Sequence, residues 1–153
     1  TTKGHCLCGE VEYEFEGKPI WVAHCHCDSC RRHTSSAVAT FVGVKVEQFR
    51  YLKGEPAFYE SSPKVWRYFC GKCGSPMAYV ADRFPGEVHL YIGTLEKPDK
   101  FVPRGHVHVG EQLPWFEVSD GLPRYEGSSS KLSTPVRRGP RPLAHADKDK
   151  GKG

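Results

Sequence analysis

The chain has 153 residues, a formal net charge of +4 and 38% hydrophobic residues. This length fits one domain with a core of its own and leaves little room for a second. The longest apolar runs span only a few residues, so neither a signal peptide nor a membrane-spanning helix is predicted. We therefore expect a soluble, cytoplasmic protein that has no membrane partner.

The positive charge is concentrated at the C-terminal end. Residues 131–153 contain seven basic side chains against two acidic ones, a net of +5, so residues 1–130 carry a net charge of −1. A basic segment without interleaved aromatic residues is typical of a solvated terminus and offers no readout of nucleic acid. We predict a folded domain over residues 1–127 and a basic, disordered tail over residues 128–153, and we do not expect a nucleic-acid partner.

The folded part is dominated by strand patterns. In residues 9–17, Val11, Tyr13 and Phe15 alternate with glutamates, which predicts a half-buried strand whose glutamates face solvent. The segment after Asp28 is the one stretch that favours a helix, a short one with Asp28 as its cap. The regular spacing of strands predicts an all-β fold of antiparallel sheets. Further strands are expected at residues 36–44, 49–54, 65–70, 76–81, 87–93 and 105–111.

Seven cysteines fall into three groups, and their spacing favours metal binding over disulfides. The groups are Cys6 with Cys8, then Cys25, Cys27 and Cys30, and finally Cys70 with Cys73. The odd count and the tight Cys-x-Cys and Cys-x-x-Cys spacings argue against a disulfide-stapled secreted domain.

The "CGKCG" stretch around Cys70 and Cys73 is typical of a turn between two strands that aims two thiolates at one ion. A redox-active Cys-x-x-Cys is the alternative, but that chemistry favours the start of a helix, which the following residues do not predict. If the first strand lies beside this turn, Cys6 and Cys8 complete a four-thiolate structural site. A different partition, with Cys6, Cys8, Cys25 and Cys27 on one ion, is the competing arrangement.

The stretch "HCHCDSC" supplies Cys25, Cys27 and Cys30, which is one ligand short of a closed zinc site. An open position is the mark of catalytic zinc, where water or substrate binds. In the alternative, a histidine closes the site and makes it structural. The candidates for this fourth ligand are His24, His26, His33, His106 and His108.

Several arginine, histidine and tryptophan residues are further candidates near this cluster. Arg31 and Arg32 would either offset the negative charge of three thiolates or hold a substrate carboxylate, or they are ordinary surface charges. His106 and His108 share one face of a predicted strand by period two, and His106 is either a structural histidine near the core or a proton-transfer group. Trp66 and Trp115 are interpreted as core or pocket wall.

With these motifs in this order, the chain resembles the glutathione-dependent formaldehyde-activating enzyme family, which also contains the centromere protein V domain. The resemblance rests on "GHCLCGEVEY", "CHCDSCRR", "RYFCGKCGSPMAY", "IGTLEKPDKF" and "HVHVGEQLPWFEVSDGLPRY". It implies a zinc-bearing β-tent fold for residues 1–127 and two zinc ions per chain. It places a structural zinc on Cys6, Cys8, Cys70 and Cys73, and a second, labile zinc on Cys25, Cys27 and Cys30.

The resemblance also implies a carbon–sulfur lyase-type activity that forms S-hydroxymethylglutathione from glutathione and formaldehyde. Glutathione or a related small thiol is then the expected partner, with Cys25, Cys27 and Cys30 as the catalytic residues. His33 and Thr34 stand where relatives often have small residues, which would favour a bulkier or more polar substrate. The alternatives are a zinc enzyme of this family with a different small-molecule substrate, and a non-catalytic zinc module that binds a partner or nucleic acid.

Overall fold

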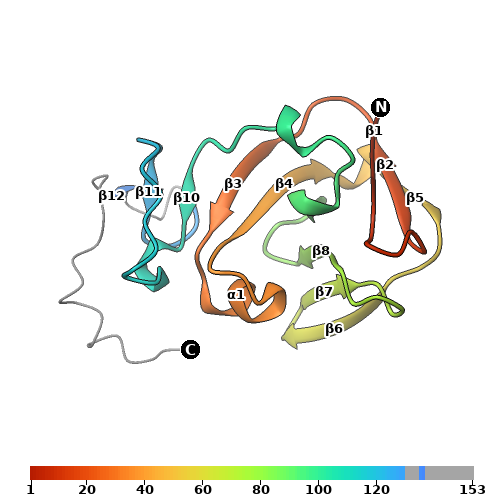
Figure 1. Ribbon diagram of the computed structural model, residues 1–153, viewed down its shortest axis with the longest axis horizontal. Helices are drawn as coiled ribbons and strands as arrows, with labels where there is room; N and C mark the ends of the chain where they lie inside the picture. Colours follow the sequence, from red (N-terminus) through yellow and green to blue (C-terminus); the bar gives the residue numbers. More distant parts are fainter. Residues whose placement is uncertain (130–134, 137–153) are drawn as a thin grey trace. The chain divides into compact units, whose positions relative to one another are not determined.

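The computed structural model describes residues 1–129 together with residues 135 and 136 (Figure 1). The basic tail predicted for residues 128–153 therefore falls almost entirely outside the described residues. Within the described part, no helix has the length and the apolar character needed to cross a membrane.

The described residues form short strands linked by turns and 3₁₀ turns, with a single α-helix of seven residues among them. The predicted all-β class is therefore confirmed. The strands are β1 (Thr2–His5), β2 (Glu12–Phe15), β3 (Trp21–Cys25), β4 (Ala39–Lys45), β5 (Phe49–Lys53), β6 (Ala57–Ser62), β7 (Val65–Phe69), β8 (Pro76–Ala81), β9 (Glu87–Tyr91), β10 (His106–Val107), β11 (Arg124–Tyr125) and β12 (Pro135–Val136). The helices are α1 (Asp28–Thr34), η1 (Val46–Gln48), η2 (Ile92–Thr94), η3 (Pro98–Lys100) and η4 (Val109–Glu111).

The chain divides into two compact units. The first comprises Thr1–Val22 with Phe41–Val102, and the second comprises Ala23–Thr40 with the residues from Pro103 onward. In the first unit, β1, β2 and β5 form one antiparallel sheet, and the strands β4, β9, β8, β7 and β6 follow one another in that order, also antiparallel (Figure 1).

The second unit contains parallel pairing, which the sequence patterns did not predict. Strand β10 pairs in parallel with β3 and with β11, while β11 and β12 are antiparallel. Parallel neighbours require a long connection, and about eighty residues of chain separate the end of β3 from the start of β10. The pairing places His106 opposite His24 and Val107 opposite Cys25.

The first unit has an apolar core to which two of the cysteines belong. The apolar half of the predicted alternation is confirmed, because Val11 just before β2 and Tyr13 and Phe15 within it are all at most 1% exposed. Glu14 departs from it: this glutamate was expected to face solvent, but it is buried and its carboxylate lies 2.5 Å from a guanidinium nitrogen of Arg50. The core cluster consists of Cys6, Val11, Tyr13, Phe15, Val22, Val42, Val44, Cys70, Met77, Ala78, Val88, Leu90 and Leu95.

The buried residues of the second unit are of a different kind. Only a few of those described are apolar, and the polar ones are as numerous: His26, His106, Gln112 and Arg124. Burying a polar group costs free energy unless it is hydrogen-bonded, so this unit depends on a network of polar contacts to a degree that the first does not.

Helix α1 carries the last three residues of the "HCHCDSC" stretch, and its cap differs from the expected one. The N-cap is Cys27, whose Sγ accepts a hydrogen bond from the Cys30 amide at 3.2 Å. Asp28 instead occupies the first helical turn, where its carboxylate pairs with Arg31 and Arg32. The prediction of Asp28 as cap was therefore wrong by one residue, because the Asp28 side chain turns to these two cations.

Gly54 allows the turn between β5 and β6 to approach the segment that carries Cys8. Its φ is +69°, and a Cβ there would lie 2.2 Å from the carbonyl oxygen of Glu10. We expect Gly54→Ala to destabilise the protein by about 2 to 4 kcal/mol, because left-handed strain and overpacking add.

Gly86→Ala is the matched control, since Gly86 has a φ of +76° and a Cβ added there would meet no atom within 4 Å. This variant should lose only about 1 kcal/mol. Urea unfolding gives the free energy of unfolding of both variants from their midpoints, provided that the m values are equal. Equal losses of this free energy in the two variants would contradict the close approach of Gly54 to Glu10.

Candidate metal centres

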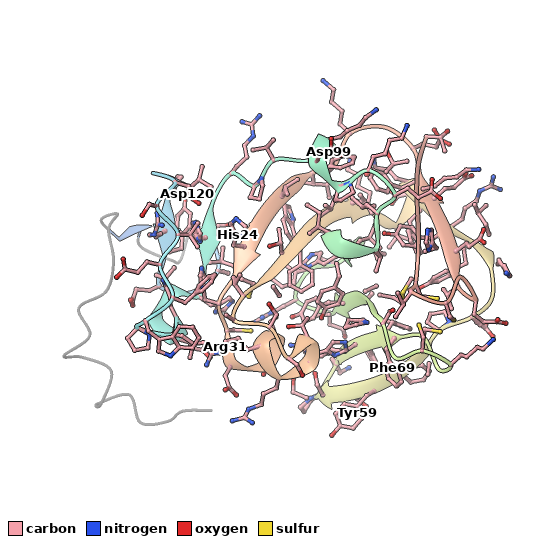
Figure 2. All side chains as sticks on the ribbon, in the orientation of Figure 1. His24, Arg31, Tyr59, Phe69, Asp99 and Asp120 are labelled. Atoms are coloured by element: carbon pink, nitrogen blue, oxygen red, sulfur yellow. The ribbon has the colours of Figure 1, made fainter. Side chains whose placement is uncertain are left out.

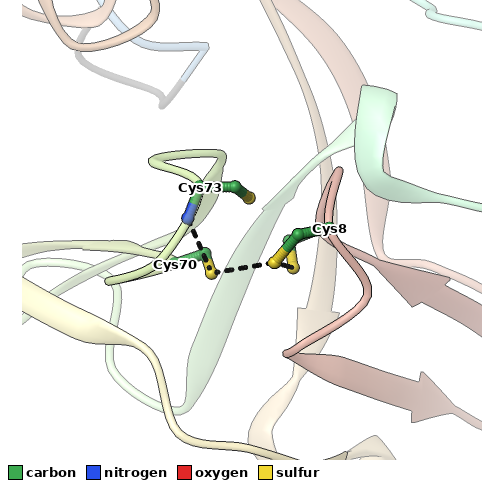
Figure 3. A group of neighbouring side chains, drawn as sticks. Cys8, Cys70 and Cys73 are labelled. Carbon is green, nitrogen blue, oxygen red and sulfur yellow. Dashed lines mark hydrogen bonds between the residues drawn. The ribbon is translucent and has the colours of Figure 1, made fainter.

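Cys6, Cys8, Cys70 and Cys73 come together in the first unit, and we call them the four-cysteine centre. Their sulfur atoms all lie within 4.8 Å of one another. The Sγ of Cys8 is 3.7 Å from that of Cys6 and 3.8 Å from that of Cys70 (Figure 3). A tetrahedral zinc ion with Zn–S bonds of about 2.3 Å requires sulfur–sulfur edges of about 3.8 Å. The two measured edges therefore fit a four-thiolate zinc site.

Backbone amides of the two turns point at these sulfurs. Cys70 Sγ accepts from the amides of Lys72 and Cys73 at 3.3 and 3.4 Å, and Cys6 Sγ accepts from the Val11 amide at 3.3 Å. Gly74, with a φ of +81°, lets the second turn close. Donors aimed at sulfur favour the thiolate, which is the form that binds metal.

Ser75 joins the two turns. Its hydroxyl oxygen accepts a hydrogen bond from the Leu7 amide at 2.9 Å and lies 3.2 Å from Cys73 Sγ. The Ser75 side chain and backbone lower the pKa of Cys73 to about 5 by hydrogen bonding to its sulfur. One serine thus ties the segments together and favours ionisation of a ligand.

Cys25, Cys27 and Cys30 come together in the second unit, and we call them the three-cysteine centre. Their sulfurs lie within 4.8 Å of one another, with Cys25 and Cys30 buried and Cys27 partly exposed. Hydrogen bonds from the Cys25 and Cys30 thiols hold the pKa of Cys27 far below its ordinary value, while the pKa of Cys25 is raised. Of these two sulfurs, Cys27 is therefore the one whose ionised form its neighbours favour. The structure groups the cysteines as four and three, and not in the competing partition.

No histidine nitrogen among the described residues joins the three sulfurs. His24 Nδ1 lies 2.8 Å from the Thr40 hydroxyl, and His26 Nε2 lies 2.8 Å from His106 Nδ1. His33 and His108 likewise fall outside the group. Among the described residues, the group that could hold a metal ion here therefore consists of three sulfurs.

The two arginines after Cys30 differ in their roles. Arg31 Nη1 donates to the carbonyl oxygens of His26 and Glu111, both at 2.5 Å, so this side chain fixes the protein's own backbone (Figure 2 labels Arg31). Arg32 pairs with Asp28 at 2.9 Å and remains 75% exposed. Of the two, only Arg32 stays accessible to a ligand.

Strand β10 is much shorter than predicted, which separates the two histidines. It ends at Val107, and His108 has a left-handed φ of 56°, so His106 and His108 do not share a strand face. His106 is 1% exposed with both ring nitrogens hydrogen-bonded, to His26 and to Asp120. Trp115 is 66% exposed and therefore does not belong to the core, whereas Trp66 is partly buried in β7.

Asp120 was not among the predicted site residues. Its carboxylate lies 2.8 Å from His106 Nε2, and His24, His106 and Asp120 form a third group with ligand atoms within 4.8 Å. No spacing in the sequence indicates this group. Asp120 lies near His106 because β11, which begins shortly after Asp120, pairs in parallel with β10, the strand that carries His106.

The family model described as glutathione-dependent formaldehyde-activating enzyme matches residues 1–111. The chain belongs to this family. The match includes all seven cysteines and His106 but ends before Asp120. Among solved structures, the chain is similar to a crystal structure of a Rhodobacter sphaeroides protein, with 26% identity and a TM-score of 0.53 over 61% of this chain and 87% of that one. No curated protein matches the chain.

The Ser75 contacts generate a test of the four-cysteine centre. Ser75→Ala removes the acceptor of the Leu7 amide and raises the pKa of Cys73, so metal should leave this centre about fivefold faster, the effect of one hydrogen bond. Metal release to a colorimetric chelator measures the rate. Ser62→Ala, at the exposed end of β6, is the control. Identical release from both variants would show that Ser75 does not support the centre.

Proposed function

We propose that the protein is a zinc-dependent enzyme of the carbon–sulfur lyase type. Its substrate is the adduct of glutathione, or a related small thiol, with an aldehyde such as formaldehyde. The observation that carries the proposal is the division of seven cysteines into a centre with four sulfurs and a centre with three, in a member of this family.

The four-cysteine centre is proposed to hold a structural zinc. Four thiolates complete a tetrahedral shell and leave no position for a substrate. Two of the four, Cys6 and Cys70, are part of the apolar core, so metal binding there contributes directly to folding.

The three-cysteine centre is proposed to hold the catalytic zinc through Cys25, Cys27 and Cys30. Bound there, a zinc ion would lower the pKa of a thiol in its open coordination position and so supply a thiolate at neutral pH. Three thiolates and one dication carry a net charge of −1, which weakens Lewis acidity. This balance favours thiol activation over polarisation of the aldehyde carbonyl.

The protein's own residues would then orient the reactants. In the condensation, the thiol sulfur bonds to the carbonyl carbon and the thiol proton ends on the aldehyde oxygen, giving a hydroxymethyl thioether. Arg32 is the exposed cation next to the centre and is proposed to pair with a carboxylate of the thiol substrate. Thr34, whose hydroxyl donates to the Cys30 carbonyl at 2.8 Å, secures the end of α1.

Glutathione as substrate implies a reducing compartment. None of the seven cysteines forms a disulfide, which is compatible with the cytoplasmic location proposed for the reaction.

The division between the two centres can be tested by metal content. Cys27→Ser should lower zinc from about two ions per chain to about one with the fold intact, because serine caps α1 as well as cysteine does. Cys70→Ser should instead unfold the first unit, since it removes a ligand from within the core. Metal analysis with circular dichroism measures both. Unchanged zinc in Cys27→Ser, or its wholesale unfolding, would refute this division.

The reaction itself can be tested with glutathione and formaldehyde. Because the condensation proceeds without a catalyst, exchange between glutathione and its adduct at equilibrium should be followed by NMR. We expect the wild-type chain to accelerate exchange at least tenfold over Cys27→Ser. Titration of the cobalt-substituted protein with glutathione should add a sulfur-to-metal absorption band. Binding without acceleration would favour a non-catalytic module, and neither effect would favour a different substrate.

A further inference from the structure

A chain of three side chains runs from Asp120 at the surface of the second unit through His106 to His26, the residue between Cys25 and Cys27 in the sequence. Asp120 Oδ2 lies 2.8 Å from His106 Nε2, and His106 Nδ1 lies 2.8 Å from His26 Nε2. His26 is the residue between Cys25 and Cys27, and it is completely buried. Figure 2 labels Asp120 and His24, the latter stacked on the ring of His106 with centroids 4.7 Å apart.

His26 is fixed at three points. Its backbone amide donates to the Val107 carbonyl at 3.1 Å, its carbonyl accepts from Arg31, and its ring meets His106. Because this residue separates two of the three sulfurs, the three contacts set the path of the chain between Cys25 and Cys27.

The direction of the hydrogen bonds follows from Asp120. Its pKa is lowered, because the Leu122 amide and His106 more than offset the effect of burial, so it is a carboxylate and can only accept. Burial lowers the pKa of His106, so its ring is neutral at pH 7 and carries its one proton on Nε2, the nitrogen that faces the Asp120 carboxylate. His106 then donates from Nε2 and accepts at Nδ1, and His26 must donate from its Nε2.

A second observation supports this direction. His26 Nδ1 is buried without a hydrogen-bond partner among the described atoms. If His26 Nε2 donates to His106, the unpartnered Nδ1 of His26 carries only a lone pair. If His106 donated to His26 instead, the proton of the neutral His26 ring would sit on Nδ1 as a buried donor without an acceptor. Orphaned buried N–H groups are the rarer and more costly case.

The third group of His24, His106 and Asp120 is a poor metal site by comparison. The rings of His24 and His106 are stacked with planes only 30° apart, so one ion cannot lie in the plane of both. The His106 nitrogen that faces Asp120 is already satisfied by the carboxylate.

We propose that Asp120, acting through His106, is a positioning residue for the three-cysteine centre: it locks His26 in the Nε2–H tautomer and thereby holds Cys25 and Cys27 in their metal-binding arrangement. The inference rests on the proposed binding of a metal ion at that centre. Asp120 itself is held by the Leu122 amide at 3.0 Å and by Arg124 at 3.4 Å, and Arg124 also donates to the carbonyls of Val118 and Leu122.

Cobalt binding to the full chain tests the proposal. Asp120→Ala should weaken cobalt at the three-cysteine centre about tenfold, the low end of the effect of removing an outer-shell partner because Asp120 acts through two histidines, and leave the four-cysteine centre unchanged. Asp120→Asn, which keeps a neutral acceptor, should recover part of the affinity. Asp82→Ala is the matched control, because Asp82 lies in the other unit and forms its ion pair with the exposed Lys64.

A double-mutant cycle shows whether Asp120 acts through His106. His106→Gln should weaken the same centre, and adding Asp120→Ala to it should cost nothing further. Additive losses would mean that Asp120 supports the unit by a separate route and would overturn the inference. Cobalt retained at the four-cysteine centre reports that each variant is folded.

Imidazole ¹⁵N NMR tests the tautomer without reference to activity. We expect His26 to be protonated at Nε2 and bare at Nδ1 in the wild-type chain, and to lose this preference in Asp120→Ala. A proton at Nδ1, or a third bound metal ion lost in Asp120→Ala, would overturn the inference. A wild-type chain with one metal ion would refute the proposed function, whereas two ions with unchanged affinity in Asp120→Ala would refute only the positioning role.

Discussion

The gathering of sulfur atoms is the constraint on which the rest of the structure depends. In the four-cysteine centre, sulfurs from segments more than sixty residues apart approach to 3.8 Å. Thiolates at that separation repel one another unless a cation lies between them, and thiols gain little from the contact. The amides directed at Cys6 and Cys70 stabilise the ionised form. The four sulfurs could therefore hold a metal ion that closes the first unit together with its apolar core.

The two units achieve stability differently. In the first, Cys6 and Cys70 belong to the same cluster as Phe15, Met77 and Leu90, so the cysteines that could hold a metal ion are part of the apolar core. The second buries histidines and an arginine in place of large apolar side chains. The second unit is therefore stabilised mainly by hydrogen bonds between its buried polar groups, and Arg31 and Asp120 take part in several of them. A polar interior costs stability but gives a centre whose ligands are individually oriented.

The sequence allowed strands β2, β4, β5, β7, β8 and β9 and the Cys-x-Cys and Cys-x-x-Cys pairs to be predicted because these are local patterns, whereas β1, β3 and β6 were missed. Joining Cys6 and Cys8 to Cys70 and Cys73 is not local, and it was expected from the family resemblance. Alternation in β2 places every second side chain on one face, and the Cys-x-x-Cys spacing dictates a turn. The failures were mostly non-local. Glu14 is buried because Arg50 on a neighbouring strand meets it, and the histidine chain exists because β10 lies parallel to β3. Nothing near Asp120 in the sequence indicates a partner fourteen residues earlier, and the left-handed turn at His108 has no glycine to signal it.

Cys27 combines two tasks that are usually carried by different residues, since it caps α1 and contributes a sulfur to the three-cysteine centre. Serine, threonine, aspartate and asparagine perform the first task at least as well. A single codon change at this position would therefore preserve the helix and the fold while removing the third sulfur. Within a lineage, the chemistry proposed for this centre can be lost while the fold is kept. A relative's fold is thus a poor guide to its activity, and residue 27 is the position to inspect.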